Sequence, residues 1–371
     1  MTFAALLAAC AISGGAITNG MQWIDGSSLP IEGQGFAQTA VPYGRMPAGV
    51  TTNVNAGVRG MGNFSTGLQL RFHAKTKKLS VRWTLAGAVG GQPKDFLSPT
   101  ARAGIDIYRR RADGIWRFVK LGVLQSPTEG LLEIADWGEG DCLVNLPGWS
   151  ALRDVSVGVD ETGTVTPLKP RANGVTKPVV FYGTSITHGS SASRPGMTFV
   201  NQVGRHLDVP VVNLGFSGSG VMEFEMSEHL AKIDASCYVL DCLWNMFMTD
   251  APDPRPSYRY RCVDENYEPF IRNLRAKCPG VPIVMAEQCD VRCGPPNKKD
   301  LFIRKLYEKL VAEGWQNLVY LPKAGMYPPD GEGTVDGCHA TDLGMTHLAR
   351  AFEKAVGTAL GLSCDRSAAQ P

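Results

Sequence analysis

Apolar and polar residues alternate in short runs over residues 21–160, and Gly, Pro and Asn separate the runs. In Leu79–Leu85 every second residue is apolar, and Ile105–Ile107, Trp116–Phe118 and Val155–Val159 repeat the pattern. Because successive side chains of a strand point to opposite faces, such runs predict strands with one buried face. No stretch of this part has convincing helical periodicity, so the pattern predicts a β-sandwich.

The pattern changes after residue 177. Five continuous apolar runs predict strands that are buried on both faces, namely Val179–Gly183, Val211–Gly215, Cys237–Asp241, Val281–Met285 and Leu318–Leu321. Helices are predicted between and after them, at Met197–Leu207, Met222–Ile233, Asp264–Lys277, Lys298–Glu313 and Asp342–Leu360. Alternating strands and helices predict a parallel sheet in a three-layer α/β domain, with ligands bound beyond the carboxyl ends of the strands.

The length of 371 residues fits two domains. We predict a sandwich domain at residues 21–165, a linker rich in Thr, Gly and Pro at 166–177, an α/β domain at 178–362 and a tail at 363–371. The 44% hydrophobic content and the net charge of +2 are typical of a globular protein. Neither value indicates a nucleic acid or an anionic membrane as a partner.

Residues 1–20 are a candidate signal segment. The apolar run Phe3–Ala11 is too short to span a bilayer. Leu7–Cys10 resembles a bacterial lipobox with a lipid anchor at Cys10, although no Lys or Arg precedes the run. We therefore expect an exported protein, which is periplasmic, secreted or anchored at the cell surface. The alternative is that the segment belongs to the fold.

The ten cysteines show no disulfide framework and no CxxC pair. Cys289 and Cys293 are candidate metal ligands, but no second Cys/His pair has the spacing of a zinc finger. We expect no metal and no cofactor, while disulfide pairing and oligomeric state stay open.

Polar residues follow the predicted strands at the edge where ligands are expected. Ser185, after the first strand, fits an exposed nucleophile but also an ordinary helix cap. Asp336 and His339 are three residues apart before the last helix, so the acid can hold the imidazole as a base. Taken singly, Ser185 and Asp336 also fit capping residues and His339 fits a surface residue. Their common position at the sheet edge favours a catalytic role.

Two more segments place hydrogen-bond donors at this edge. Gly218 lies in a flexible loop whose backbone N–H can approach a ligand, and Asn245 follows the third strand with a carboxamide. Acyl transfer needs such donors because negative charge builds on the carbonyl oxygen. Trp244 is a candidate substrate wall, unless it is core. For His188, a substrate contact or a solvated side chain is expected.

The order of these residues resembles the four blocks that name the SGNH (GDSL-type) hydrolase superfamily, here Ser185, Gly218, Asn245 and His339. Thr184 replaces the Asp of GDS, Ala340 replaces the Pro of DGxHPxxxG, and the third block, DCLWNM, departs from GxND. NLGFSG and DCLWNM resemble a subgroup with an N-terminal β-sandwich, and Gly104–Tyr108 resembles the GxDLY signature of that domain.

The resemblance implies a flavodoxin-like three-layer α/β/α domain with a parallel sheet, preceded by a jelly-roll-like β-sandwich. It implies that Ser185 is the nucleophile, that His339 is the base and that Asp336 orients His339. The backbone N–H groups of Ser185 and Gly218, with the Asn245 side chain, would form the oxyanion hole. The implied activity is that of a serine esterase acting on a small acyl ester, and the expected substrate is an acetylated carbohydrate.

Three alternatives stay open. An acyltransferase would pass the acyl group from Ser185 to an alcohol instead of water. A glycan-binding protein would carry a vestigial hydrolase domain, although the complete set of site residues argues against decay. A cysteine hydrolase that uses Cys242 or Cys289 lacks a neighbouring acid-held His in the sequence.

Overall fold

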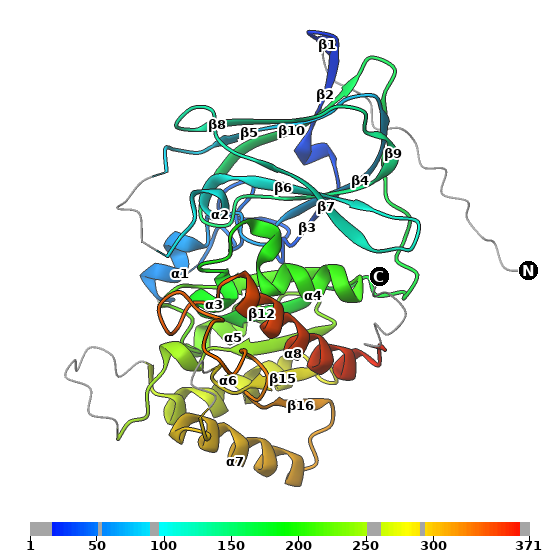
Figure 1. The fold of residues 1–371 in the computed structure, drawn as a ribbon. Helices are drawn as coiled ribbons and strands as arrows, with labels where there is room; N and C mark the ends of the chain where they lie inside the picture. Colours follow the sequence, from blue (N-terminus) through cyan, green and yellow to red (C-terminus); the bar gives the residue numbers. More distant parts are fainter. Residues whose placement is uncertain (1–16, 51–53, 90–95, 251–260, 290–293, 364–371) are drawn as a thin grey trace, which may run out of the picture.

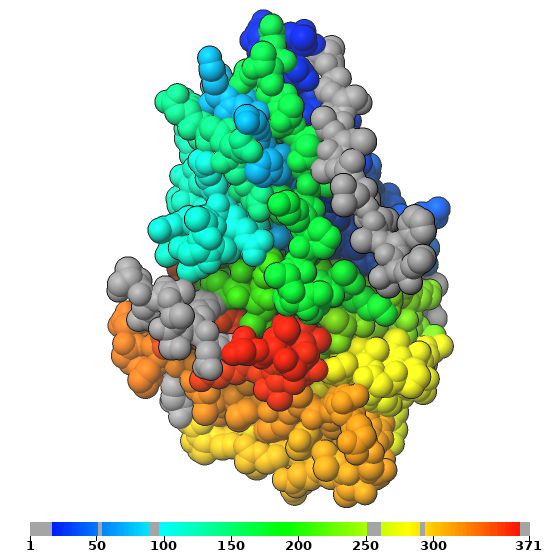
Figure 2. Space-filling view, turned by 90° about the vertical axis from the view of Figure 1, so that its right-hand side faces the viewer, coloured from blue at the N-terminus to red at the C-terminus, as the bar shows by residue number. Residues whose placement is uncertain are grey.

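The computed structural model describes residues 17–50, 54–89, 96–250, 261–289 and 294–363. They form a sandwich domain, which runs from β1 to β11, and an α/β domain, which runs from β12 to α8 (Figure 1). Figure 2 shows the sandwich domain above the α/β domain, with helix α8 (red) at the surface of the lower part. The lipobox candidate Cys10, the metal-ligand candidate Cys293 and most of the tail lie outside the described residues.

The sandwich domain consists of two antiparallel sheets. The first sheet has the strand order β1 (Ile17–Thr18), β2 (Met21–Asp25), β10 (Leu152–Asp160), β5 (Leu79–Leu85), β8 (Glu129–Ile134). The second has the order β11 (Thr164–Pro167), β4 (Gln69–Thr76), β9 (Gly138–Asn145), β6 (Ile105–Arg110), β7 (Trp116–Gly122), and β3 (Ile31–Glu32) pairs with β4. The apolar residues of β5 are all buried in the core between the sheets, as their alternation predicts.

The sequence pattern did not predict the short elements of this domain. Helices α1 (Ala56–Met61) and α2 (Pro99–Ala103) span little more than one turn each, which is too short for a periodic pattern. A 3₁₀ turn, η1, covers Gly26–Ser28. Strand β11 extends into the predicted linker, and Val165, just before that linker, is its single buried apolar residue. One apolar residue shows no alternation, so the strand could not be recognised.

The α/β domain has a five-stranded parallel sheet. Its order is β13 (Val211–Gly215), β12 (Val179–Gly183), β14 (Cys237–Asp241), β15 (Ile283–Ala286), β16 (Leu318–Leu321). This is the flavodoxin-like order, and it confirms the predicted fold class. Helices α4 (Phe199–Leu207) and α8 (Asp342–Leu360) pack on one face of the sheet. The opposite face is covered by α5 (Phe224–Leu230), α6 (Val263–Lys277) and α7 (Lys298–Ala312).

Three further short helices connect these elements, namely α3 (Ser185–His188), η2 (Pro195–Met197) and η3 (Leu243–Asn245). Helix α4 begins two residues later than predicted, because η2 ends at Met197 and the Thr198 side chain caps α4. No helix in the described ranges is both long and apolar enough to cross a bilayer.

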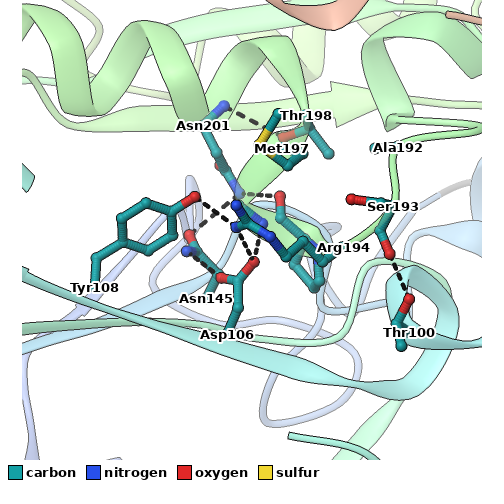
Figure 3. Close-up of polar contacts among 12 residues, drawn as sticks. Thr100, Asp106, Tyr108, Asn145, Ala192, Ser193, Arg194, Met197, Thr198 and Asn201 are labelled. Carbon is teal, nitrogen blue, oxygen red and sulfur yellow. Dashed lines mark hydrogen bonds and ion pairs between the residues drawn. The ribbon is translucent and has the colours of Figure 1, made fainter. Parts of the chain in front are cut away.

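Residues of the GxDLY signature join the two domains (Figure 3). The Arg194 guanidinium, which follows the α3 turn, donates to Asp106 Oδ2 at 2.9 Å and to the Tyr108 hydroxyl at 2.6 Å. The Gly196 N–H donates to the same carboxylate oxygen at 2.8 Å, and Asn145 donates to Asp106 Oδ1 at 2.6 Å. Asp106 is fully buried, so its charge depends on these partners. The signature therefore has a structural role at the domain interface.

Candidate active site

Ser185 follows the carboxyl end of β12 and is the first residue of the one-turn helix α3. The Thr184 hydroxyl caps this turn by accepting a hydrogen bond from the Ile186 N–H at 3.2 Å. The cap of this turn is thus Thr184 and not Ser185, which leaves the Ser185 hydroxyl available for chemistry. Ser185 Oγ lies 3.0 Å from His339 Nε2.

His339 is held by the turn that precedes α8. Asp336 Oδ1 accepts hydrogen bonds from the N–H groups of Cys338 (2.9 Å) and His339 (2.7 Å), and Asp336 Oδ2 lies 2.6 Å from His339 Nδ1. One carboxylate therefore shapes the turn and orients the imidazole. Partial burial raises the pKa of Asp336, but these hydrogen bonds outweigh it and leave the pKa below its usual value.

The loop that carries Gly218 lies directly beside the end of β12. The Phe216 N–H donates to the Gly183 carbonyl at 2.9 Å. A Cβ on Gly220 would lie 2.0 Å from that carbonyl oxygen, so only glycine permits this approach. Gly218 itself has φ +66°. The turn therefore brings Gly218 next to the strand end that leads into Ser185.

Asn245 reaches the same loop from η3. Its Nδ2 donates to the carbonyls of Gly220 at 3.2 Å and of Phe216 at 3.4 Å, both long for such bonds. Within the described part of the chain, the N–H groups of Ser185 and Gly218 donate to no other protein group. The structure thus brings the three predicted oxyanion donors to one edge of the sheet, beside Ser185.

His188 is not solvated, contrary to one of the two expectations for it. The side chain is fully buried, and its Nε2 lies 2.9 Å from Thr66 Oγ1 and 3.0 Å from the Gly148 carbonyl oxygen. Its ring stacks on Trp149 at 3.6 Å between centroids. All three partners belong to the sandwich domain, so His188 lies at the domain interface and is shielded from solvent. The partners are distant in sequence, and no local pattern could reveal them.

Trp244 is half-buried beside the site, and its indole N–H donates to Cys289 Sγ at 3.2 Å. Cys242 and Cys289 are both buried, and burial raises their thiol pKa values well above the usual range. A thiolate nucleophile is therefore disfavoured at either position. Among the described residues, the thiols of Cys142, Cys237, Cys242, Cys278, Cys289 and Cys338 are free. In the described ranges, no three His, Cys, Asp or Glu side chains are grouped to hold a metal ion.

Sequence reasoning missed one residue of the site. The Phe96 ring, from the sandwich domain, stacks on the His339 imidazole with centroids 4.3 Å apart and an interplanar angle of 11°. Phe96 stands in a loop outside every motif, so no signal in the sequence pointed to it.

Comparisons with known proteins agree with this architecture. Residues 176–357 match the GDSL-like lipase/acylhydrolase family, and residues 21–165 match GxDLY, described as the N-terminus of the esterase SGNH hydrolase type. A protein from Bacteroides ovatus named as a GDSL-like lipase is 27% identical, with a TM-score of 0.77 over 92% of this chain and 99% of its own. No curated protein matches this chain.

Two further solved structures share the fold at lower identity. The salicylyl-acyltransferase SsfX3 from a tetracycline biosynthetic pathway is 19% identical, with a TM-score of 0.72 over 94% of this chain and 100% of its own. A family two carbohydrate esterase from Clostridium thermocellum, in complex with cellohexaose, is 13% identical, with a TM-score of 0.56 over 80% and 93% of the chains.

Proposed function

The chain belongs to the GDSL-like lipase/acylhydrolase family of SGNH hydrolases, and we propose that it is a serine esterase that hydrolyses a small acyl ester. One observation carries the proposal, namely the continuous series of contacts from Ser185 Oγ through the His339 imidazole to the Asp336 carboxylate. A nucleophile, a base and an acid that orients the base are the three groups that acyl transfer to a serine requires.

In the proposed mechanism, Ser185 Oγ attacks the ester carbonyl carbon while His339 Nε2 takes the hydroxyl proton. Asp336 stabilises the imidazolium that forms, through the bond to Nδ1. The tetrahedral intermediate then breaks its C–O bond, and His339 gives the proton to the leaving alcohol. Water, activated by His339, attacks the acyl-Ser185 ester in the same way and releases the acid.

The oxyanion would be stabilised by the N–H groups of Ser185 and Gly218 and by the Asn245 amide. Positive φ at Gly218 and the close approach of Gly220 to Gly183 fix the loop before substrate binds. Such preorganised donors need no rearrangement as the charge develops, which is what makes them effective.

For the substrate we propose an acetyl or other short acyl group on a carbohydrate. Ser185 is only 7% exposed, which favours a small acyl group over a long chain. The shared two-domain fold with family two carbohydrate esterases supports a carbohydrate as the alcohol portion. Initial rates on nitrophenyl esters of increasing acyl length, then on acetylated oligosaccharides, test both parts.

Acyl transfer is the second candidate function, because the chain shares its fold along 94% of its length with an acyltransferase. The two reactions use the same acyl-Ser185 intermediate and differ only in the acceptor. Product analysis with sugar or alcohol acceptors present separates them, since a transferase yields a new ester instead of free acid.

The serine mechanism itself is tested with a fluorophosphonate probe and intact-mass detection. We expect one adduct on the wild-type protein and none on Ser185→Ala. Absence of the wild-type adduct, or an equal adduct on the variant, would reject the serine-esterase proposal.

A further inference from the structure

We infer that Phe96 of the sandwich domain is a positioning residue for His339, so that the active site is completed by both domains. Its ring would hold the imidazole plane and stabilise the imidazolium formed during catalysis. This inference rests on the proposed function of Ser185, Asp336 and His339. It extends that function by giving the sandwich domain a role in the chemistry.

The stacking geometry is the first support. The rings of Phe96 and His339 are 4.3 Å apart and nearly parallel, at 11°. The two edges of the imidazole contact Ser185 Oγ and Asp336 Oδ2, at 3.0 Å and 2.6 Å. Phe96 covers one face of the same ring. Hydrogen bonds in the ring plane do not hold this face in place, so the stacked ring supplies a separate restraint.

The backbone of Phe96 is held by the loop that follows the nucleophile. The Ser191 hydroxyl donates to the Phe96 carbonyl at 2.8 Å. Two residues further, the Ser98 hydroxyl donates to the Ser193 carbonyl at 2.8 Å, and the Thr100 hydroxyl donates to the same carbonyl (Figure 3). The position of the aromatic ring is thus set by contacts between the domains.

The same loop is tied to the segment that carries the base. The Ser193 N–H donates to Asp342 Oδ1 at 2.8 Å, and the Ser193 hydroxyl donates to Asp342 Oδ2. Asp342 begins α8, three residues after His339. Ser193 therefore links the backbone around Phe96 to the backbone around His339, and both partners of the stack are anchored to one another.

An aromatic face carries negative electrostatic potential and attracts a cation placed over it. In the proposed mechanism His339 becomes cationic when it takes the Ser185 proton. The attraction therefore grows on the way to the transition state, and its loss is expected in kcat more than in KM. A cation–π contact of this kind corresponds to about a tenfold change in rate.

The experiment compares kcat and KM of wild type, Phe96→Ala, Phe96→Leu and Phe96→Tyr on a short-chain nitrophenyl ester. We expect kcat to fall about tenfold for Ala and for Leu, with KM nearly unchanged, and to be restored by Tyr. Leu keeps an apolar side chain of similar size, so it separates the aromatic face from simple packing. Full activity of Phe96→Ala, or rescue by Leu equal to that by Tyr, would overturn the inference.

Leu131→Ala is the matched control, because Leu131 is an exposed apolar residue of the same domain, on β8. We expect this substitution to leave kcat unchanged. Fluorophosphonate labelling of wild type distinguishes the two hypotheses. If the wild-type protein forms no adduct, the proposed function fails. If it forms the Ser185 adduct and Phe96→Ala turns over at the wild-type rate, only the role of Phe96 fails.

Discussion

At the scale of single side chains, we propose two roles for Asn245, and its replacement by Ala removes both. We expect Asn245→Ala to lower kcat by about a hundredfold or more, because one oxyanion donor is lost. The Asn245 amide also donates to the loop carbonyls of Phe216 and Gly220, so a modest loss of thermal stability should accompany it. Asn273→Ala, which removes an amide on α6, is the control. We expect it to lower thermal stability and to leave kcat unchanged. A wild-type kcat in Asn245→Ala would exclude Asn245 from the oxyanion hole.

Asp336 offers a sharper test, because its two oxygens act on different partners. In Asp336→Asn the amide oxygen can still accept from the N–H groups of Cys338 and His339, so the turn should survive. The negative charge beside His339 Nδ1 is lost, and we expect kcat to fall by about three to four orders of magnitude. Steady-state kinetics and thermal unfolding of the variant together check this. A loss of less than tenfold would mean that another group orients His339.

Several of these single-residue contacts could be predicted from the sequence and others could not. Asp336 and His339 are three residues apart, so their contact follows from local geometry. The partners of His188 and of Phe96 come from the other domain, at sequence separations that no periodic pattern records. Contacts across a domain interface depend on how the surfaces of the two domains pack together. A local sequence pattern describes one element and does not contain that information.

At the scale of the elements, the loop between β13 and α5 depends on a backbone contact. We expect Gly220→Ala to destabilise the protein by about 2–4 kcal/mol, because the new Cβ would meet the Gly183 carbonyl oxygen at 2.0 Å. Gly218→Ala is the matched comparison for stability, because a Cβ at this position meets no other atom. Only the positive φ of the backbone should then lower the free energy of unfolding, by about 1–2 kcal/mol. Urea unfolding of both variants measures the difference. Equal losses would show that the loop can move away from β12.

Element boundaries were predictable where a pattern was long and the ends carried a cap. Strand β12 and helix α8 have the predicted bounds, since β12 is wholly buried and α8 is nineteen residues long between the Thr341 cap and Gly361. Helix α5 is shorter than predicted, because apolar residues at both of its ends are buried in turns that are not helical. Burial alone therefore does not define a helix end.

At the scale of the whole molecule, the two domains share buried polar groups and do not merely touch. The Arg45 guanidinium from the sandwich domain is buried and donates to the carbonyls of Asn213 and Gly215 on β13. Asp106 is paired with Arg194 in the same interface. The sequence indicated the signature that contains Asp106, but its partner is 88 residues away and could not be predicted.

Stability against pH is also a property of the whole molecule, and Asp241 at the end of β14 should influence it. Burial raises the pKa of this carboxyl to about 7, and the hydrogen bond that Thr187 donates at 2.7 Å opposes the shift only in part. In the unfolded chain the group titrates near its ordinary value of 3.8. Between these values the folded state holds a proton that the unfolded state has lost. The stabilisation is therefore full below pH 3.8 and disappears as the pH rises through 7.

We accordingly expect the free energy of unfolding of wild type, relative to that of Asp241→Asn, to decrease between pH 5 and pH 8. Asparagine does not ionise, and its amide oxygen can still accept from Thr187, so the variant lacks this pH dependence. Glu223, whose pKa is also raised by burial to about 7, changes both proteins alike and cancels in the comparison. Urea unfolding of both proteins at pH 5, 6, 7 and 8 makes the measurement. Parallel pH dependence of the two proteins would mean that Asp241 titrates equally in the folded and unfolded states, because only a difference between those states makes stability depend on pH.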